Sequence, residues 1–179
     1  SLYITTESEA SAIFMEWNDS EFEEVGKQLL LPLFEGVSKA PNNALSGLSR
    51  SQRSLVREAI ASDDFKGKKG QRMAVWTPGC RVLLAGMGKK TEFGHRKARN
   101  IGARVMAALS KKNGLALTVR FTSGWSSERM LDFAEGMMLR DYEFLEHQRI
   151  DDEHITEPWS ADFQASARHQ DALADGLSR

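Results

Sequence analysis

The residues best suited to chemistry are the glycines and lysines that close an apolar run, RVLLAGMGKK over residues 81–90. A glycine-rich turn between a strand and a helix can hold phosphate, because its backbone N–H groups and the helix N-terminus attract anions. A Walker phosphate loop needs Gly, four residues, then Gly-Lys-Ser/Thr. Here Lys90 follows Gly88-Lys89, and Leu83 stands where the first glycine belongs. The Walker loop is therefore excluded.

A dinucleotide-binding turn is disfavoured by the same residues. Its fingerprint is Gly-x-Gly-x-x-Gly, which starts at Gly86 and Gly88 but meets Thr91 at the third position. That third glycine normally allows close packing of helix on strand. The stretch is better interpreted as a strand-to-helix turn, with only a generic capacity to attract an anion.

Basic residues surround this turn, and they are the candidate contacts with an anion or a partner: Lys89, Lys90, Arg96, Lys97, Arg99 and Arg104. One hypothesis is a nucleic-acid contact, because clustered cations are its electrostatic footprint. The interpretation we favour is a solvated face, or a face that meets an acidic surface of another domain or subunit.

Metal and nucleophile chemistry finds little support. His95, His147, His154 and His169 form no metal-binding pair, and the acidic cluster at 151–154 lies in a predicted linker. Cys80 opens an apolar strand without an evident base, so we expect an inert thiol. SGWSS lacks the spacing of a nucleophile elbow. We expect Trp125 and the methionines of residues 130–138 to be core residues.

Composition and charge set the class of protein. The chain has 179 residues, of which 41% are hydrophobic and 27% charged, typical of a globular domain. Its apolar runs are too short to cross a bilayer, and no signal peptide opens it, so we expect a cytoplasmic protein without membrane contact. Net charge is −7 over residues 1–24, +13 over 25–140 and −7 over 141–179. The acidic ends could fold back on the basic body or meet a partner.

Periodicity predicts an α/β domain with a mixed sheet. We expect β-leaning runs at 2–7 and 11–17, a helix start near Asp19, and a buried strand at 27–36 in which Pro32 marks a strand end or an edge. Apolar residues at three- and four-residue steps predict a helix from Ala44 to Ile60. The strands 72–77 and 81–88 are joined by Pro78-Gly79, which favours an antiparallel hairpin.

The second half of the chain continues this alternation. A helix should start at a Thr91 cap, bury Ala98, Ile101, Gly102, Val105 and Leu109, and end at Asn113-Gly114. A strand at 115–121 precedes a helix capped by Ser126 or Ser127. Residues 146–160 have the composition of an acidic linker, and helical spacing returns from Asp162 to Leu177. We therefore expect one domain over 1–145 and a linker with a helix over 146–179.

These motifs together resemble the N-terminal domain of the leucyl aminopeptidase (cytosol aminopeptidase) family. The similar segments are LLLPLFEG, FKGKKGQ, RVLLAGMGKKTEF and AEGMMLRDYEF, in that order from about Leu29 to Phe144. The tail FQASARHQDALADGLSR resembles the family's linker helix that leads to the catalytic domain. The acidic start has no counterpart that we can align.

The resemblance implies a macro-domain-like, three-layer α/β sandwich whose mostly parallel sheet has helices on both faces. It also implies a non-catalytic assembly or regulatory domain, serving a metallopeptidase that removes N-terminal residues from peptides. Two divalent metals, zinc or manganese, are then expected in a catalytic domain beyond Arg179, since no NTDAEGR-type motif is present. No catalytic or metal-binding residue is expected in this chain itself.

The partners implied are the family's own catalytic domain and the neighbouring subunits of a hexamer. Two alternatives remain open. One is a free-standing macro-like module that binds ADP-ribose or a related nucleotide. The other is a nucleic-acid contact module that uses the basic middle of the chain, which would show salt-dependent DNA binding.

Overall fold

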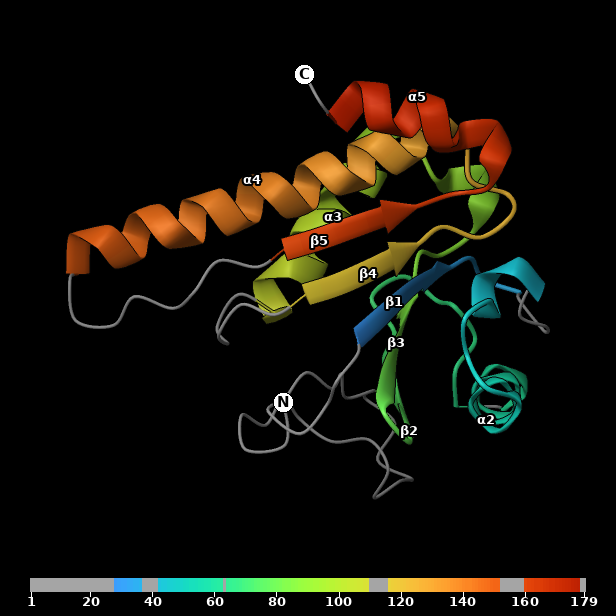
Figure 1. Cartoon of the computed structure of the whole chain (residues 1–179). Coiled ribbons are helices and arrows are strands. Elements are labelled where there is room, and N and C mark those ends of the chain that lie inside the picture. The colour runs from blue at the N-terminus through green and yellow to red at the C-terminus, as the bar shows by residue number, and fades with distance from the viewer. Residues whose placement is uncertain (1–27, 37–41, 63, 110–115, 152–159, 178–179) are drawn as a thin grey trace.

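The protein is built on one five-stranded sheet with helices on both faces (Figure 1). The structure, a computed structural model, describes residues 28–36, 42–62, 64–109, 116–151 and 160–177. The strands are β1 (Gln28–Leu33), β2 (Arg72–Thr77), β3 (Cys80–Gly86), β4 (Ala116–Arg120) and β5 (Ser160–Gln164). The helices are α2 (Arg50–Ala61), α3 (His95–Leu109), α4 (Ser127–Asp151) and α5 (Ala167–Leu177), with short 3₁₀ segments η1 (Asn42–Leu45) and η2 (Lys90–Glu92).

The sheet has the mixed, mostly parallel arrangement that the sequence predicts. Its strand order is β2-β3-β1-β4-β5, in which only β2 runs antiparallel to its neighbour. The β2–β3 hairpin turns at Pro78-Gly79, where Gly79 has a φ of 75° that favours glycine. The predicted hairpin is therefore confirmed.

Strand β1 occupies the centre of the sheet because its sequence, QLLLPL, is apolar on both faces after Gln28. All six residues are buried, as expected for a strand with helices on each side. Pro32 is the next-to-last residue of β1, beyond the stretch that pairs with β4. Its carbonyl accepts a hydrogen bond from the Trp125 indole at 3.2 Å. Pro32 thus lies near the end of its strand, which is one of the two predicted positions. The strand is central in the sheet, so the other predicted position, an edge, is wrong.

The alternation of side chains along β1 divides the core in two. Leu29, Leu31 and Leu33 pack in the cluster that includes α2. Leu30 faces the opposite side and packs with buried residues of α3, α4 and α5. The predicted three-layer arrangement is confirmed, with α2 on one face and the other three helices on the second (Figure 1).

Two glycines bring α3 and α4 into close contact. A Cβ added to Gly102 would lie 2.2 Å from the Phe133 carbonyl oxygen. A Cβ added to Gly136 would lie 2.0 Å from the Arg99 carbonyl oxygen. Each helix therefore presents a glycine to the backbone of the other, and the five predicted core residues of α3 are all buried.

The predicted helix starts near residues 44 and 91 are wrong. Between η1 and α2, Gly47 has a φ of 83°, and α2 begins only after Ser49, which forms a capping box with Gln52. Thr91 lies within η2, and α3 begins at His95. The reason is Phe93, whose burial against other aromatic rings takes the backbone off a helical path.

The tail also differs from its prediction. Helix α4 continues to Asp151, so residues 146–151 are helical where a linker was expected. Ser160–Gln164 form strand β5, paired with β4, so residues 162–164 are extended where helical spacing predicted the start of a helix. Helix α5 then starts at Ala167. Burial of Phe163 against the sheet, in the core shared with α3 and α4, accounts for the strand.

The α4 cap and its core face are largely as predicted. The Ser126 hydroxyl accepts a hydrogen bond from the Arg129 backbone N–H at 3.2 Å, which confirms the serine cap. Met130 and Met137 are buried, but Met138 is 43% exposed, so its prediction as a core residue is wrong. The predicted N-terminal strands, the helix start near Asp19 and the Asn113-Gly114 helix end lie outside the described residues.

Candidate functional site

The turn after β3 uses its backbone donors within the protein. The N–H of Gly86 donates to the Gln71 carbonyl at 2.7 Å, and that of Met87 donates to the Leu33 carbonyl at 2.9 Å. The N–H of Gly88 donates to the Gly67 carbonyl at 2.9 Å. Because a phosphate cradle needs free N–H groups, this turn cannot act as one.

The two glycines of this turn are required by packing. A Cβ added to Gly86 would lie 2.0 Å from the carbonyl oxygen of Lys68, in the preceding loop. Gly88 has a φ of 81°, in the region that favours glycine. We call residues 86–88, with the loop 66–71 that they contact, the glycine turn. It agrees with the strand-to-helix turn inferred from sequence, although η2 separates it from α3.

The six predicted contact residues are distributed over the turn, η2 and α3. Lys89, Lys90, Arg96 and Arg104 are exposed. Two others are engaged at the surface: Lys97 lies 3.8 Å from Glu92, and Arg99 lies 3.7 Å from Glu135 of α4. Exposed pairs of this kind contribute little to stability. The structure thus places Arg99 on the α4 side and leaves the remaining cations facing solvent.

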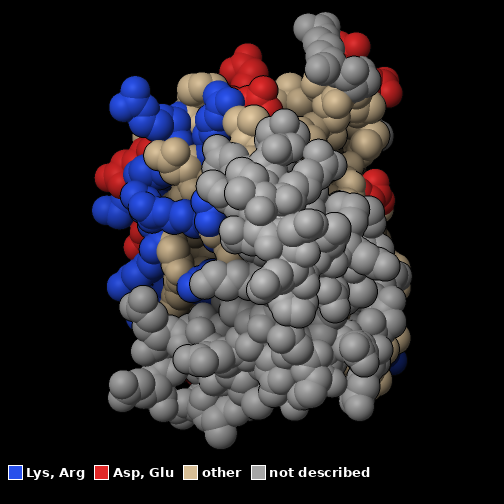
Figure 2. Space-filling model, turned by 90° about the vertical axis from the view of Figure 1, so that its left-hand side faces the viewer, with Lys and Arg blue, Asp and Glu red and all other residues tan. Residues whose placement is uncertain are grey.

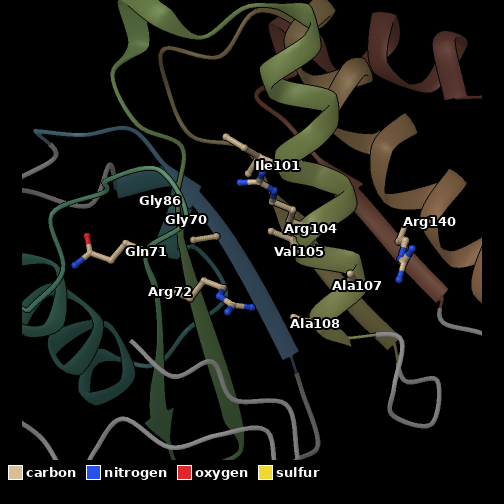
Figure 3. Close-up of a pocket in the computed structure, with 11 residues that line it drawn as sticks. Gly70, Gln71, Arg72, Gly86, Ile101, Arg104, Val105, Ala107, Ala108 and Arg140 are labelled. Atoms are coloured by element: carbon tan, nitrogen blue, oxygen red, sulfur yellow. The ribbon is translucent and has the colours of Figure 1, made fainter. Parts of the chain in front are cut away.

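A groove lies between α3 and the β2–β3 strands, with a volume of about 470 Å³. We call it the basic groove, and its main residues are Arg72, Ala85, Ile101, Arg104, Val105 and Arg140. Figure 3 shows Arg72 reaching from the start of β2 toward α3, and Arg104 reaching from α3 back toward the strands. The groove therefore combines an apolar floor with guanidinium groups on its walls.

A second hollow extends this basic surface along α3. It is lined by Lys69, Arg96, Lys97 and Arg104, together with Glu92 and His95. Figure 2 shows Lys and Arg side chains gathered along the left-hand side of the molecule in that view. Sequence reasoning found Arg96, Lys97 and Arg104 but missed Lys69, Arg72 and Arg140, which reach the same surface from other elements.

Arg120, by contrast, is used inside the fold. Its guanidinium donates to the carbonyls of Ala44 and Ser46, at 2.9 and 2.7 Å, and to the side chain of Gln164 at 3.1 and 2.9 Å. Burial lowers the pKa of Arg120, and the nearby Cys80 and Asp162 partly oppose that shift. The hydrogen bonds of this arginine connect η1 and the residue after it to the ends of β4 and β5.

Two histidine contacts join elements that are distant in sequence. His95 Nδ1 lies 2.6 Å from Asp132 of α4, whose second oxygen lies 3.3 Å from the Arg129 guanidinium. His169 Nδ1 of α5 lies 2.7 Å from the Ser127 hydroxyl of α4. A Ser-His pair performs nucleophilic chemistry when a third group orients the histidine. Among the described residues His169 has no carboxylate partner, so we interpret the pair as a contact between α4 and α5.

Cys80 and Trp125 both lie in the core. Cys80 is buried, with 2% of its surface exposed. Trp125 is a packing residue, with ring centroids 4.8 to 5.5 Å from Phe34, Phe93, Phe121 and Phe133. In the described ranges, no three His, Cys, Asp or Glu side chains could hold a metal ion together. The 151–154 cluster lies outside the residues whose side chains are described.

Across the described part of the chain, no helix combines the length and the apolar character that a membrane span requires.

Comparisons with known proteins give a consistent result. Residues 30–149 match the model of the cytosol aminopeptidase family, N-terminal domain. A probable cytosol aminopeptidase of Alkaliphilus oremlandii is 26% identical over 131 residues, which cover 69% of this chain and 26% of that protein. The chloroplastic neutral leucine aminopeptidase of Solanum lycopersicum is 31% identical over 108 residues, which cover 58% of this chain and 19% of that protein. The chain therefore spans about a quarter or less of the length of these relatives.

The fold is shared with a solved structure. A tomato leucine aminopeptidase mutant matches with a TM-score of 0.62 and 20% identity, over 97% of this chain and 37% of the other. The match therefore extends beyond the segment matched by the family model to nearly the whole chain. At this level of identity it shows a common α/β fold.

Proposed function

Because the chain belongs to the cytosol aminopeptidase family, through that family's N-terminal domain, we propose that it is the non-catalytic assembly or regulatory part of a longer metallopeptidase. The longer protein would remove N-terminal residues from peptides. The observation that carries this proposal is the match over residues 30–149, since the relatives that share it are aminopeptidases about four times as long as the shared region. Cytoplasmic location is part of the same proposal.

The metals of such an enzyme would bind outside this chain. We propose that two divalent ions, zinc or manganese, are held by a catalytic domain that follows Arg179. In that arrangement, residues 1–145 supply most of the N-terminal domain, and residues 146–179 complete its sheet and core before they lead toward the catalytic domain. Strand β5 pairs with β4 and α5 packs in the core, so the connection to a catalytic domain would start from a fixed position on this domain.

The exposed cations are the proposed contact with a partner surface. Lys89, Lys90, Arg96 and Arg104 face solvent on one flank, where an acidic face of the catalytic domain or of a neighbouring subunit could meet them. Lys97 and Arg99 would contribute less, because each already lies near a carboxylate of this chain. A hexamer is the assembly that we expect for the full-length protein.

The coding sequence provides the first test. We expect the reading frame to continue past the codon for Arg179 into a segment with the Asp, Glu and Lys pattern of a two-metal peptidase. A stop codon directly after Arg179 would overturn the proposal. The longer protein should hydrolyse leucine p-nitroanilide when Mn²⁺ or Zn²⁺ is supplied, whereas the present chain should not.

Assembly can be tested in the longer protein by charge reversal. Glutamate at Lys89, Lys90, Arg96 and Arg104 should shift the oligomer to smaller species in light scattering. The control reverses two cations, Arg50 and Arg53 of α2, on the opposite face of the sheet. The variant with glutamate at Arg96 and Arg104 alone has the same charge change as this control. An unchanged oligomer in the first variant would exclude this flank as the subunit contact.

Nucleic-acid contact is a second candidate, and the gathering of cations in Figure 2 favours it. Titration with a labelled DNA duplex at several salt concentrations tests it, because phosphate contacts release counterions and weaken steeply with salt. An ADP-ribose module has less support, since the N–H groups of the glycine turn are bound to carbonyls of this chain.

A further inference from the structure

The basic groove has the features of a docking surface for an acidic and apolar ligand. Ile101 and Val105 are buried residues of α3 that form part of its floor, and Ala85 contributes from β3. Arg72 and Arg104 stand on opposite walls (Figure 3). Among the described carboxylates, none forms an ion pair with either arginine, whereas Arg99 on the far side of α3 lies near Glu135.

The mixed character of the groove discriminates between classes of ligand. Guanidinium groups bind phosphates and carboxylates alike, so the cations alone do not select a ligand. Only a ligand that carries apolar groups beside its anionic groups also fills the floor. A nucleic-acid backbone would leave the floor uncovered. A polypeptide that alternates acidic and apolar side chains fits both parts.

This chain contains such a segment. Residues 13–24, IFMEWNDSEFEE, lie outside the described residues and contain Ile, Phe, Met and Trp together with one Asp and four Glu. No Lys or Arg occurs anywhere in residues 1–24, which carry a net charge of −7. We propose that residues 13–24 bind in the basic groove of the same molecule.

The distances permit this contact. Residue 24 is four positions before Gln28 and residue 13 is fifteen, so the segment can reach up to about 50 Å from the start of β1 at about 3.3 Å per extended residue. A domain of this size has a radius of gyration of about 15 Å. Tethering gives the segment an effective concentration of about a millimolar, so weak contacts are sufficient.

The consequence is competition for one surface. When the segment is bound, it neutralises Arg72 and Arg104 and covers the apolar floor, so an acidic partner must displace it. The inference does not depend on the proposed enzymatic role, because it concerns only two parts of this chain.

The test uses the full chain with a nitroxide spin label on Ser20→Cys. Labelling is selective because Cys80, the only native cysteine, is buried. In the ¹⁵N-labelled protein, we expect strong paramagnetic broadening of the backbone amides of Gly70, Ile101 and Arg104. The double variant Arg72→Glu/Arg104→Glu should reduce that broadening at Gly70 and Ile101 several-fold, and 0.5 M NaCl should weaken it through screening.

The control variant Arg50→Glu/Arg53→Glu carries the same charge change on α2 and should leave the broadening unchanged. If Arg72→Glu/Arg104→Glu fails to fold, as judged by its amide spectrum, Arg72→Gln/Arg104→Gln replaces it with the same expectation. Broadening centred on another surface, or broadening that the groove variants do not reduce, would overturn the proposal.

Two further outcomes would also count against it. In the first, two proteins are mixed: one carries the spin label but no ¹⁵N, and the other carries ¹⁵N but no spin label. This mixture should give no broadening. Broadening in that mixture would mean that the segment binds a second copy. If the spin label has no effect on the groove but a DNA duplex shifts the same amides, the groove is a nucleic-acid surface instead.

Discussion

The glycine turn and the basic groove share Gly86, but the polar groups of the turn are hydrogen-bonded within the protein and two arginines of the groove are not paired with a described carboxylate. In the turn, the three successive N–H groups of residues 86–88 bind carbonyls from β1 and from the loop 66–71. In the groove, the guanidinium groups of Arg72 and Arg104 have no described carboxylate partner. The turn resembles a ligand-binding loop in sequence, but the guanidinium groups without a described carboxylate partner lie beside it, in the groove.

This contrast bears on how a glycine-rich motif should be judged. Glycine permits close approach of backbone, and that approach serves either a ligand or another part of the chain. Here a Cβ on Gly86 would meet the Lys68 carbonyl oxygen, so the space is taken by this protein. Four substitutions test this contrast: two in the glycine turn, one at an arginine that bonds within the fold, and one in the groove, where we expect the weakest destabilisation.

The strongest destabilisation should come from Gly86→Ala. The added methyl group would collide with backbone that cannot move without breaking the bonds of the turn. We expect the free energy of unfolding to fall by about 3 kcal/mol, as for severe overpacking. Urea denaturation measures this. Gly94→Ala is the control, because its Cβ would meet nothing within 4 Å and should change stability little. Equal effects of both variants would refute the steric explanation.

Arg120→Met tests an arginine that the fold uses internally. The change removes hydrogen bonds to the carbonyls of Ala44 and Ser46 and to Gln164 while keeping an apolar stem. Bonds to charged groups contribute more than neutral ones, so we expect a loss of about 2 kcal/mol. Hydrogen exchange should show faster opening of η1. A loss below about 0.5 kcal/mol, the usual range for surface substitutions, would mean that this arginine behaves like those of the groove.

Gln71→Ala tests the loop that closes the glycine turn. Its side-chain oxygen accepts from the Lys66 N–H at 2.8 Å, and its amide donates to the Asp64 carbonyl at 2.7 Å. We expect destabilisation by about 1 kcal/mol, because part of the site is exposed and water replaces the lost bonds. The thermal midpoint should fall accordingly. Stability equal to that of the parent protein would show that the backbone bonds alone hold the loop.

The weakest effect on folding should come from Arg104→Gln. This residue is exposed and forms no described ion pair, so its change should alter the free energy of unfolding by less than about 0.5 kcal/mol. The same variant should weaken the binding of any acidic ligand in the groove. A clear loss of stability would indicate a structural role for Arg104 and would remove the contrast between the two regions.

Much of the fold is predictable because it depends on local pattern. The apolar sequence of β1, the Pro78-Gly79 hairpin and the buried face of α3 are consequences of side-chain periodicity and turn chemistry. The errors occur where distant contacts override local preference. Residues 162–164 share helical spacing with the residues of α5, but pairing with β4 makes them part of a strand. Helix α3 starts later than predicted because the ring of Phe93 packs against Phe34 and Trp125.

The candidate site was only partly predictable for the same reason. Arg96, Lys97 and Arg104 are close in sequence, and a charge cluster identifies them. Arg72 comes from β2 and Arg140 from α4, and no sequence spacing links them to α3. Likewise, His169 and Ser127 are 42 residues apart and meet only because α5 packs on α4.

The family, the alternation of strands and helices, and the glycine-rich turn could all be identified from the amino-acid sequence. Hydrophobic periodicity is a local property that every short segment carries, so it needs no knowledge of distant contacts. Which of these features are open to a ligand depends instead on the tertiary contacts. Whether an N–H or a guanidinium is occupied is set by groups brought from elsewhere in the chain, as Leu33, Gly67 and Gln71 are brought to the glycine turn.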